Sequence, residues 1–436
     1  MSARKNKRES HPTRRTETQA PLGKRTGWIV LLGVAIIWLA GLAWRGGIGE
    51  RFAVVYVADA AFHYRLVDHL LESGRPMAAD PLFVQVEPRV PFRDMYPPAF
   101  HYLAACWVRL AGWAGVSRES ALYGLCALLG SLMVPLTGWL AWRAARRADA
   151  AVSAMLLAAA ATPLVTRGAY GILRPEPFGA ALVVLAALLA ADWSSHRSRG
   201  RQAVWLVVAA LVHALGAGTW RLFPALAALG VGAAVTSDWL AERRPRRLPV
   251  LLAGIAGTAA AGIACDFYLA GAPDHLLFLL PALLPAAVHM VVGSGRACAF
   301  GVRIGATRRW AGLGAIVALL VTAGFAVVPV LRARVIGWLG TGGVPLNEAN
   351  LYGRIVNELQ PLDLLAAFAQ ERWFYLPAAM AALAAVWIWR RASRPGDPFL
   401  VVTAIGYGLA ALLFVRFEYV AAPFALALLA AALRDA

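Results

Sequence analysis

Apolar runs long enough to cross a lipid bilayer constrain the fold of this chain more than any other feature. Two of them read ALVVLAALLAADW (181–193) and GLGAIVALLVTAGFAVVPVL (312–331), and both are continuous. A transmembrane helix needs about 20 mainly apolar residues, whereas the strands of a membrane β-barrel are short and alternate in polarity. Hydrophobic residues make up 60% of the 436-residue chain. The sequence therefore predicts an all-α polytopic membrane protein.

The formal net charge of +18 is spread over short basic clusters at the ends of apolar runs. This is the positive-inside pattern of membrane proteins, so we expect no nucleic-acid partner. Residues 1–27 are polar and basic, and the apolar run from Trp28 lacks a small-residue cleavage site, which predicts a cytoplasmic tail before an uncleaved signal anchor. The clusters placed in the cytoplasm are RAARR (143–147), HRSRGR (196–201), ERRPRR (242–247), GVRIGATRR (301–309) and RRASR (390–394).

These cytoplasmic clusters fix the parity of the spans between them. The span predicted at 28–44 leads outward, and the span at 120–142 must return because RAARR follows it. The apolar stretch 99–115 therefore should not cross, and its Trp107 and Trp113 favour an in-plane helix in the outer interface. The remaining spans, which bring the total to twelve with both termini inside, are predicted at about 150–165, 178–193, 203–218, 222–236, 248–264, 275–293, 311–330, 373–390, 398–415 and 418–433.

This topology predicts a single membrane domain at 28–436 and no separate soluble domain of ordinary size. The outer loops fall at about 45–119, 166–177 and 331–372. A membrane protein rarely keeps carboxylates at such positions without a use for them, and we therefore expect the loops to build one site. Its acidic members are Asp59, Glu176 and Glu358.

Asp59 opens an amphipathic stretch in the first outer loop. Apolar residues recur there at helical spacing, which predicts a helix lying flat on the membrane. Asp59 and His63 are one turn apart and would share a face, so they could bind a cation or activate an acceptor. The alternative is that Asp59 only caps the helix and His63 only lies at the interface. The apolar positions are Phe62, Leu66, Val67, Leu70 and Leu71, opposite Arg65, Asp68, His69 and Glu72.

Glu176 lies between two prolines in the second outer loop, TRGAYGILRPEPFG (166–179). The glycines and prolines of this loop prevent a continuous helix and predict an irregular turn at the membrane edge. Non-helical backbone at this depth is tolerated where it lines a wet cavity, so Glu176 is a candidate ligand or general base. The alternative is a solvated turn glutamate paired with Arg174.

The third outer loop, WLGTGGVPLNEANLYGRIVNELQPLD (338–363), contains glycines in its first half and Glu358 near its end. This composition is expected of a mobile lid over a substrate. An ordinary solvent-exposed loop would look the same, and that is the alternative.

Five arginines map to the outer ends of spans, where the positive-inside bias should deplete them. Guanidinium groups bind phosphate oxygens through paired hydrogen bonds, so this enrichment predicts an anionic ligand such as a lipid phosphate or diphosphate. Snorkelling to lipid headgroups is the alternative. The arginines are Arg167, Arg174, Arg221, Arg354 and Arg416.

Taken together, the loops resemble those of the catalytic subunit of oligosaccharyltransferases, which are membrane enzymes of the GT-C superfamily that transfer glycans from a polyprenyl diphosphate to protein. The first outer loop is similar at ADAAFHYRLVDHLLESGRP and the in-plane helix at YPPAFHYLAACWVRL. The later similarities are TRGAYGILRPEPFG, GRIVNELQP and RFEYVAAPFALALLAA. The resemblance covers most of the membrane portion and implies a GT-C-type fold.

The resemblance also implies a role for each matching residue. Asp59 falls on the family's aspartate that contacts metal and acceptor, Glu176 on the second acid of the second loop, and Glu358 on the fifth-loop glutamate. These acids would hold a divalent cation, magnesium or manganese, while Arg416 would hold the departing lipid diphosphate. This sequence has Arg174 where the family usually has the first acid of the second-loop pair, which removes one metal ligand and adds a positive charge.

The resemblance has a second departure, because the family's last span and its extracytoplasmic soluble domain with a Trp-Trp-Asp motif have no counterpart in these 436 residues. That motif reads the asparagine sequon in the family. The resemblance therefore does not favour transfer to an Asn-X-Ser/Thr peptide, and the acceptors left open are another protein hydroxyl, a lipid and a growing glycan.

The sequence as a whole predicts a membrane-embedded inverting glycosyltransferase using a polyprenyl-phosphate- or diphosphate-linked sugar on the extracytoplasmic face. The composition suggests a GC-rich bacterial genome, so we expect the inner membrane with the site facing the periplasm. One alternative is a GT-C monosaccharide transferase that uses a polyprenyl monophosphate sugar. Others are a non-enzymatic transporter of lipid-linked glycans and an inactive scaffold. The catalytic candidates are Asp59 and Glu358, the metal ligands Asp59, Glu176 and Glu358, and the substrate-binding residues Arg416, Arg174, Arg167, Arg354, Arg221 and His63.

Overall fold

Helices make up every regular element among the residues described by the structure, which is a computed structural model. Two of these helical stretches, Arg118–Ala145 and Arg199–Thr219, are long and apolar enough to cross a membrane. The twelve-span topology stays a prediction, and its spans at 275–293, 311–330 and 373–390 lie outside the described residues. The described residues are 24–52, 58–77, 97–161, 164–165, 168, 171–193, 198–220, 222–224, 226–227, 230, 248–264, 398–413 and 418–435.

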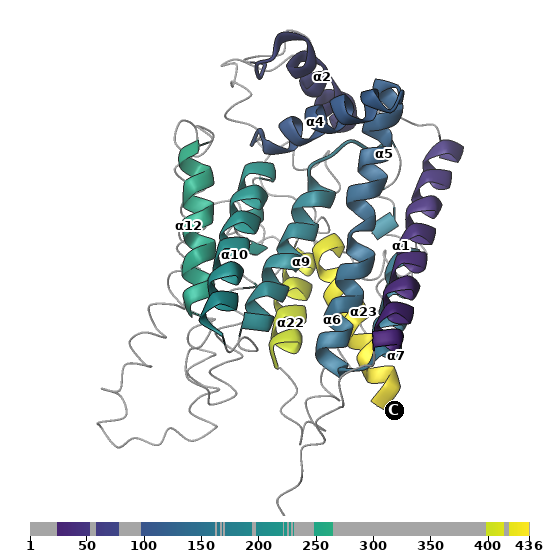
Figure 1. Ribbon diagram of the computed structural model, residues 1–436, viewed down its shortest axis with the longest axis vertical. Helices are drawn as coiled ribbons and strands as arrows, with labels where there is room; N and C mark the ends of the chain where they lie inside the picture. The colour runs from purple at the N-terminus through teal and green to yellow at the C-terminus, as the bar shows by residue number, and fades with distance from the viewer. Residues whose placement is uncertain are drawn as a thin grey trace, which may run out of the picture.

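Most of the helices stand side by side as a bundle, and α2 and α4 lie across one end of it (Figure 1). The helices are α1 (Lys24–Phe52), α2 (Ala58–Ser73), α4 (Ala99–Trp113), α5 (Arg118–Ser131), α6 (Met133–Ala145), α7 (Ala148–Ala160), α9 (Glu176–Asp192), α10 (Arg199–Thr219), α12 (Leu248–Ala264), α22 (Pro398–Leu413) and α23 (Glu418–Asp435).

The crosswise helix α4 corresponds to the stretch that was predicted to lie in the interface. Pro98 occupies its N-cap position, where the missing amide hydrogen of a proline costs nothing. The helix ends where Gly115 adopts a φ of 76° and the Val116 amide donates to the Ala111 carbonyl at 3.1 Å. Glycine adopts this left-handed conformation without strain, and the chain then turns into α5.

Helices α5 and α6 follow one another as a single candidate span with one interruption at Leu132. The Ser117 hydroxyl caps the start by accepting from the Ser120 amide at 3.2 Å. Pro135 has no amide hydrogen to donate to the Ser131 carbonyl, which explains the break. The sequence predicted one uninterrupted span at 120–142 and missed this feature.

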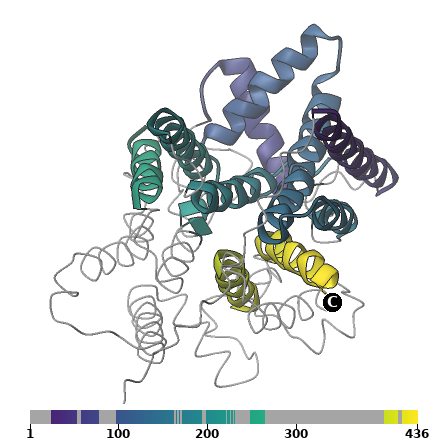
Figure 2. The same ribbon diagram turned by 60° about the horizontal axis from the view of Figure 1, so that its bottom comes forward.

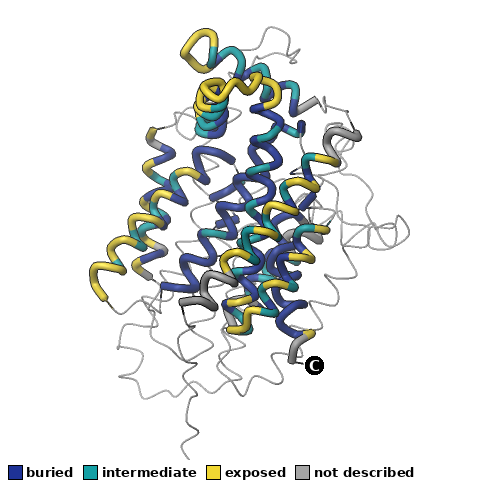
Figure 3. Tube along the Cα trace, turned by 45° about the vertical axis from the view of Figure 1, so that its right-hand side comes forward, coloured by how far each residue is buried: buried dark blue, intermediate teal, exposed yellow. Residues whose placement is uncertain are grey.

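Helix α9 forms the centre of the bundle. Each of its residues except Leu185 is buried, and Figure 3 shows the central helices dark blue along most of their length. A helix that is apolar on all sides is expected to be surrounded by other helices. The one carboxylate at its far end, Asp192, forms an ion pair with Arg143 of α6.

Helices α10 and α12 approach closely because small residues line their contact. A Cβ atom added at Gly257 would lie 2.0 Å from the Ala210 carbonyl oxygen, and one at Gly254 would lie 2.7 Å from Nε2 of His213. Small residues allow such backbone contact between membrane helices. The opposite face of α10 exposes Val204 and Leu211, as expected of a surface turned toward lipid.

Helices α22 and α23 lie side by side at the C-terminal end of the chain (Figure 2). The rings of Tyr407 and Phe424 stack with centroids 4.9 Å apart, and the Tyr407 hydroxyl donates to the Leu226 carbonyl at 2.7 Å. Helix α23 also packs against α6 and α7. These contacts join the last described helices to the first half of the bundle.

Candidate functional site

Helix α2 carries Asp59 as its second residue. Its predicted apolar face is confirmed, because Phe62, Leu66, Val67 and Leu70 are all buried. Val67 and Leu70 belong to the same hydrophobic core as residues of α4 and α5. Asp59 therefore belongs to a helix that packs against α4 and α5.

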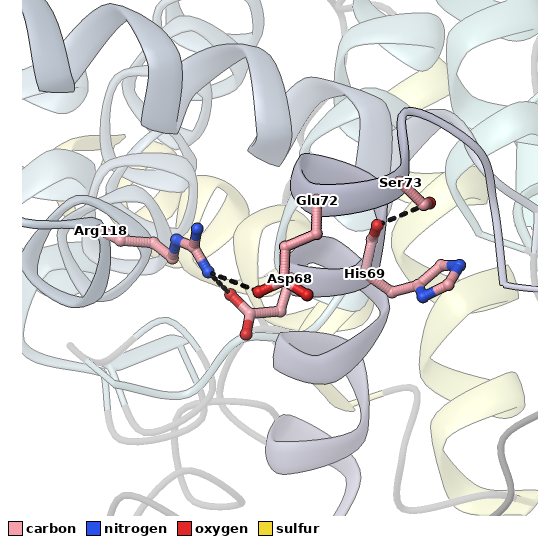
Figure 4. A network of polar contacts seen from close by, with 5 residues as sticks. All are labelled: Asp68, His69, Glu72, Ser73 and Arg118. Atoms are coloured by element: carbon pink, nitrogen blue, oxygen red, sulfur yellow. Dashed lines mark hydrogen bonds and ion pairs between the residues drawn. The ribbon is translucent and has the colours of Figure 1, made fainter.

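Arg118, the first residue of α5, ties the charged face of α2 to the bundle (Figure 4). Its Nη1 atom donates to Oδ1 of Asp68 and lies 3.7 Å from Oε1 of Glu72. The Ser73 hydroxyl closes the end of α2 by donating to the His69 carbonyl at 2.7 Å. Exposed ion pairs contribute little stability, so this network adds only weakly to the apolar contacts that hold α2 on the bundle.

His63 and His101 form a buried hydrogen bond between α2 and α4, with Nδ1 of His63 3.0 Å from Nε2 of His101. Phe100 packs edge-on against His63, with ring centroids 6.2 Å apart. Burial lowers the pKa of His101 well below its usual value, and the neighbouring His63 lowers this pKa further. His101 is thus neutral at physiological pH, and one imidazole donates to the other.

This burial bears on the predicted role of His63. Its side chain is 2% exposed, so in this structure the imidazole faces α4 and not the surrounding solvent. The alternative that His63 only lies at the membrane interface stays a prediction. That His63 contacts a substrate stays a prediction.

Arg174 and Glu176 are brought together at the start of α9, and both side chains are buried. The sequence placed Glu176 in an irregular loop, but it is the first residue of α9, with Pro175 at the N-cap and Pro177 next in the helix. Proline is favoured at a helix start, and the helix dipole stabilises a carboxylate there. With Glu176 only 6% exposed, the solvated glutamate of the alternative is wrong, whereas its pairing with Arg174 stays a prediction.

The segment that leads to these residues is pressed against α5. A Cβ atom added at Gly130 would lie 2.4 Å from Cα of Gly168, so the two backbones are in direct contact. Gly171 adopts a φ of 88°, which a residue with a side chain rarely adopts. The Cys126 thiol lies against the backbone of Arg174. The position of Arg174 is therefore determined by α5.

Several predicted site residues cannot be located relative to this group. No side-chain contact is described for Asp59, although its backbone lies in α2. Among the described residues, no three His, Cys, Asp or Glu side chains are grouped as a metal site, but two of the three predicted metal ligands have no described side chain. The predicted residues outside the described part of the chain are Arg167, Arg221, Arg354, Glu358 and Arg416.

Two buried polar residues, one in α4 and one in α1, were missed by the sequence analysis. His101 is the partner of His63, and Arg45 of α1 is completely buried. The sequence signal for Arg45 was a basic residue at the outer end of the first span, where the positive-inside bias disfavours one. The signal for His101 was a polar residue on the same helical face as the buried Ala104, Ala105 and Val108.

Neither a protein-family model nor a curated protein matches this sequence. Among solved structures, the apo oligosaccharyltransferase of Archaeoglobus fulgidus is similar with a TM-score of 0.70 and 18% identity, over 94% of this chain and 50% of that chain. The A. fulgidus oligosaccharyltransferase AglB in complex with an inhibitory peptide and a dolichol-phosphate gives 0.69 and 18%, over 95% and 51%.

A third structure is the A. fulgidus oligosaccharyltransferase in complex with Zn and sulfate, which gives a TM-score of 0.64 and 17% identity over 93% of this chain and 49% of that chain. This chain thus spans about half the length of the structures that it matches. Over almost all of its own length, the chain has the fold of the archaeal oligosaccharyltransferases.

Proposed function

We propose that this chain is a membrane-embedded inverting glycosyltransferase of the oligosaccharyltransferase type, which transfers a glycan or sugar from a polyprenyl diphosphate or phosphate to an acceptor outside the cytoplasm. The observation that carries the proposal is the similarity to the A. fulgidus enzyme, with a TM-score of 0.70 over 94% of this chain. The A. fulgidus structures with dolichol-phosphate and with an acceptor peptide containing the NVT sequon support a lipid-linked donor and a peptide acceptor.

The chemistry assigned to the residues is a displacement at the anomeric carbon of the sugar, which inverts its configuration. Asp59 orients the acceptor or removes its proton as the bond to the sugar forms, and Glu358, from the third predicted outer loop, holds the acceptor. Arg416 and Arg174 stabilise the negative charge that develops on the departing lipid phosphate. The burial of Arg174 supports this role, because charge–charge interactions are stronger where water is excluded.

The carboxylate ligands in this proposal are suited to a divalent cation. Carboxylate oxygens are the ligands that magnesium and manganese prefer, and Glu176 is a carboxylate held out of water at the start of α9. Asp59, Glu176 and Glu358 would hold the ion, which would neutralise negative charge when bound. Arg174, two residues from Glu176, supplies positive charge at the same position and weakens the affinity for the cation.

The proposal is tested with purified protein in detergent, a polyprenyl-diphosphate-linked glycan and fluorescent acceptor peptides with and without an NVT sequence. We expect transfer by the unchanged chain and none by Asp59→Ala or Glu358→Ala, at equal expression. Glu72→Ala is the matched control, since Glu72 lies on the same helix but is exposed. Full activity in both acidic variants would refute the site assignment.

The same assay separates the rival functions. Transfer from a polyprenyl monophosphate sugar only would indicate the monosaccharide transferase. Movement of labelled lipid across the membrane of vesicles that contain the protein, without any glycan transfer, would indicate the transporter. A peptide lacking the sequon, or a lipid acceptor, that is glycosylated as well as the NVT peptide would exclude dependence on the sequon.

A further inference from the structure

Arg45 is the largest completely buried side chain in the described part of the protein. It lies in the outer part of α1, one to two turns before the helix ends at Phe52. The neighbouring residue Trp44 is exposed, as are Leu39 and Ile36 earlier in the helix. Helix α1 therefore exposes apolar side chains of the kind expected to face lipid, and the guanidinium group of Arg45 points into the bundle.

The guanidinium group binds backbone carbonyls in two different segments. Nη1 donates to the Gly41 carbonyl of its own helix at 2.9 Å, and Nη2 donates to the Leu164 carbonyl at 3.4 Å. Nε has no hydrogen-bond partner among the described residues.

Such an arrangement is costly for stability. Burying a charged group without a matching counter-charge carries a desolvation penalty that apolar residues of similar volume avoid. An arginine this close to the helix end could instead have extended toward the interface. The Arg45 side chain stays buried and does not extend toward the interface. We therefore look for its contribution in the backbone carbonyl that it holds in place.

Leu164 lies at the beginning of the segment that leads to Arg174 and Glu176. A Cβ atom added at Gly168 would lie 3.3 Å from the Leu164 carbonyl oxygen and 2.7 Å from Cα of Gly130. The Leu164 carbonyl is thus shared between Arg45 on one side and the Gly168 turn on the other. The close packing of this carbonyl against the Gly168 turn leaves little room for either to move alone.

We propose that Arg45 is a positioning residue, whose guanidinium fixes the Leu164 carbonyl relative to α1. This inference rests on the proposed function for its consequence, since the fixed carbonyl belongs to the segment that leads to Arg174 and Glu176. Arg45 sets the spacing of these phosphate-binding and acidic residues without contacting the donor.

The first test is hydrogen–deuterium exchange by mass spectrometry of the purified chain in detergent. Arg45→Met should raise the exchange of peptides covering 161–177 at least threefold, because the hydrogen bond to the Leu164 carbonyl is lost. Arg143→Met is the matched control: Arg143 is also a buried arginine, but it pairs with Asp192 and donates to the Ala191 carbonyl at 2.9 Å. This control should raise exchange near α6 and the end of α9 and leave 161–177 unchanged.

The second test uses the transfer assay. Arg45→Met should raise the KM for the polyprenyl-linked donor about tenfold, with a thermal midpoint no lower than that of the unchanged chain. Arg45→Lys, which can still donate to one carbonyl, should restore part of this KM. A merely structural arginine would instead lower the midpoint and the amount of active protein at unchanged KM.

Unchanged exchange at 161–177 in Arg45→Met would overturn the positioning role, whatever the chain catalyses. An unchanged donor KM in an active Arg45→Met enzyme would also overturn it. If the unsubstituted protein transfers no glycan but Arg45→Met still raises hydrogen exchange at 161–177, the proposed function is refuted and the positioning role of Arg45 stands.

Discussion

Gly130→Ala is the substitution whose effect follows most directly from the geometry. The new Cβ atom would lie 2.4 Å from Cα of Gly168 and 3.0 Å from its carbonyl oxygen, whereas ordinary contacts are 3.4–4 Å. The two backbones would have to separate by about 1 Å to reach such a contact. Both contacting atoms belong to the backbone, so no side-chain rotation can relieve the clash. Overpacking of this kind costs about 1–3 kcal/mol.

The assay is thermal unfolding of the purified protein in detergent, followed by intrinsic fluorescence. Gly124→Ala is the control on the same helix, because a Cβ atom there would meet nothing within 4 Å. That control should stabilise the protein by about 0.5–1 kcal/mol, since alanine favours helix more than glycine does. Gly130→Ala should unfold at a lower temperature than the unchanged chain, and the donor KM should rise because Arg174 and Glu176 follow the displaced turn. Equal midpoints for the two variants would refute the close contact between α5 and Gly168.

Three further predictions concern the crosswise helices and the bundle. The pKa of His101 is lowered in the folded protein, so the unfolded chain takes up the proton first. Its contribution to stability is complete above about pH 6.5 and falls as the pH drops, by up to about 1.4 kcal/mol per pH unit, until the folded-state pKa is reached. Unfolding midpoints measured between about pH 7.5 and 5 should show this decline, and His101→Gln should flatten it; an identical decline in the variant would contradict the assignment. Gly257→Leu should separate α10 from α12, because even a Cβ atom would lie 2.0 Å from the Ala210 carbonyl oxygen. It should lower the unfolding temperature, and a midpoint equal to that of the unchanged chain would speak against this packing. A double-mutant cycle of Arg118→Ala and Asp68→Ala should give a coupling of about 0.2–1 kcal/mol that decreases with salt, and a salt-independent coupling would contradict an exposed ion pair.

Helix positions were predicted well because length and apolar periodicity are local properties of the chain. The span predicted at 248–264 and helix α12 cover the same residues, and the span at 203–218 lies inside α10. The amphipathic pattern after Asp59 likewise predicted which face of α2 is buried. The break at Leu132 was missed, although its cause, Pro135, is visible in the sequence, because a proline near the middle of an apolar run does not by itself end a span.

The candidate site was predicted less completely, because its residues come from segments far apart in the chain. Arg174 and Glu176 were recognised from their loop, but their burial depends on α5 and on the start of α9. His63 was predicted to share a helical face with Asp59, and only the position of α4 relative to α2 reveals that it meets His101.

The sequence alone determined that this chain is a helical membrane protein, where most of its described helices lie, and which acidic and basic residues are candidates for a phosphate-linked site. These follow from composition, from periodicity and from charge at the ends of spans, all of which act over a few residues. Only the tertiary structure decided that Gly130 touches Gly168, that His63 pairs with His101 and that Arg45 holds the Leu164 carbonyl. Each of these contacts joins residues at least 38 positions apart, and their distances follow from the packing of whole helices, which no local pattern encodes.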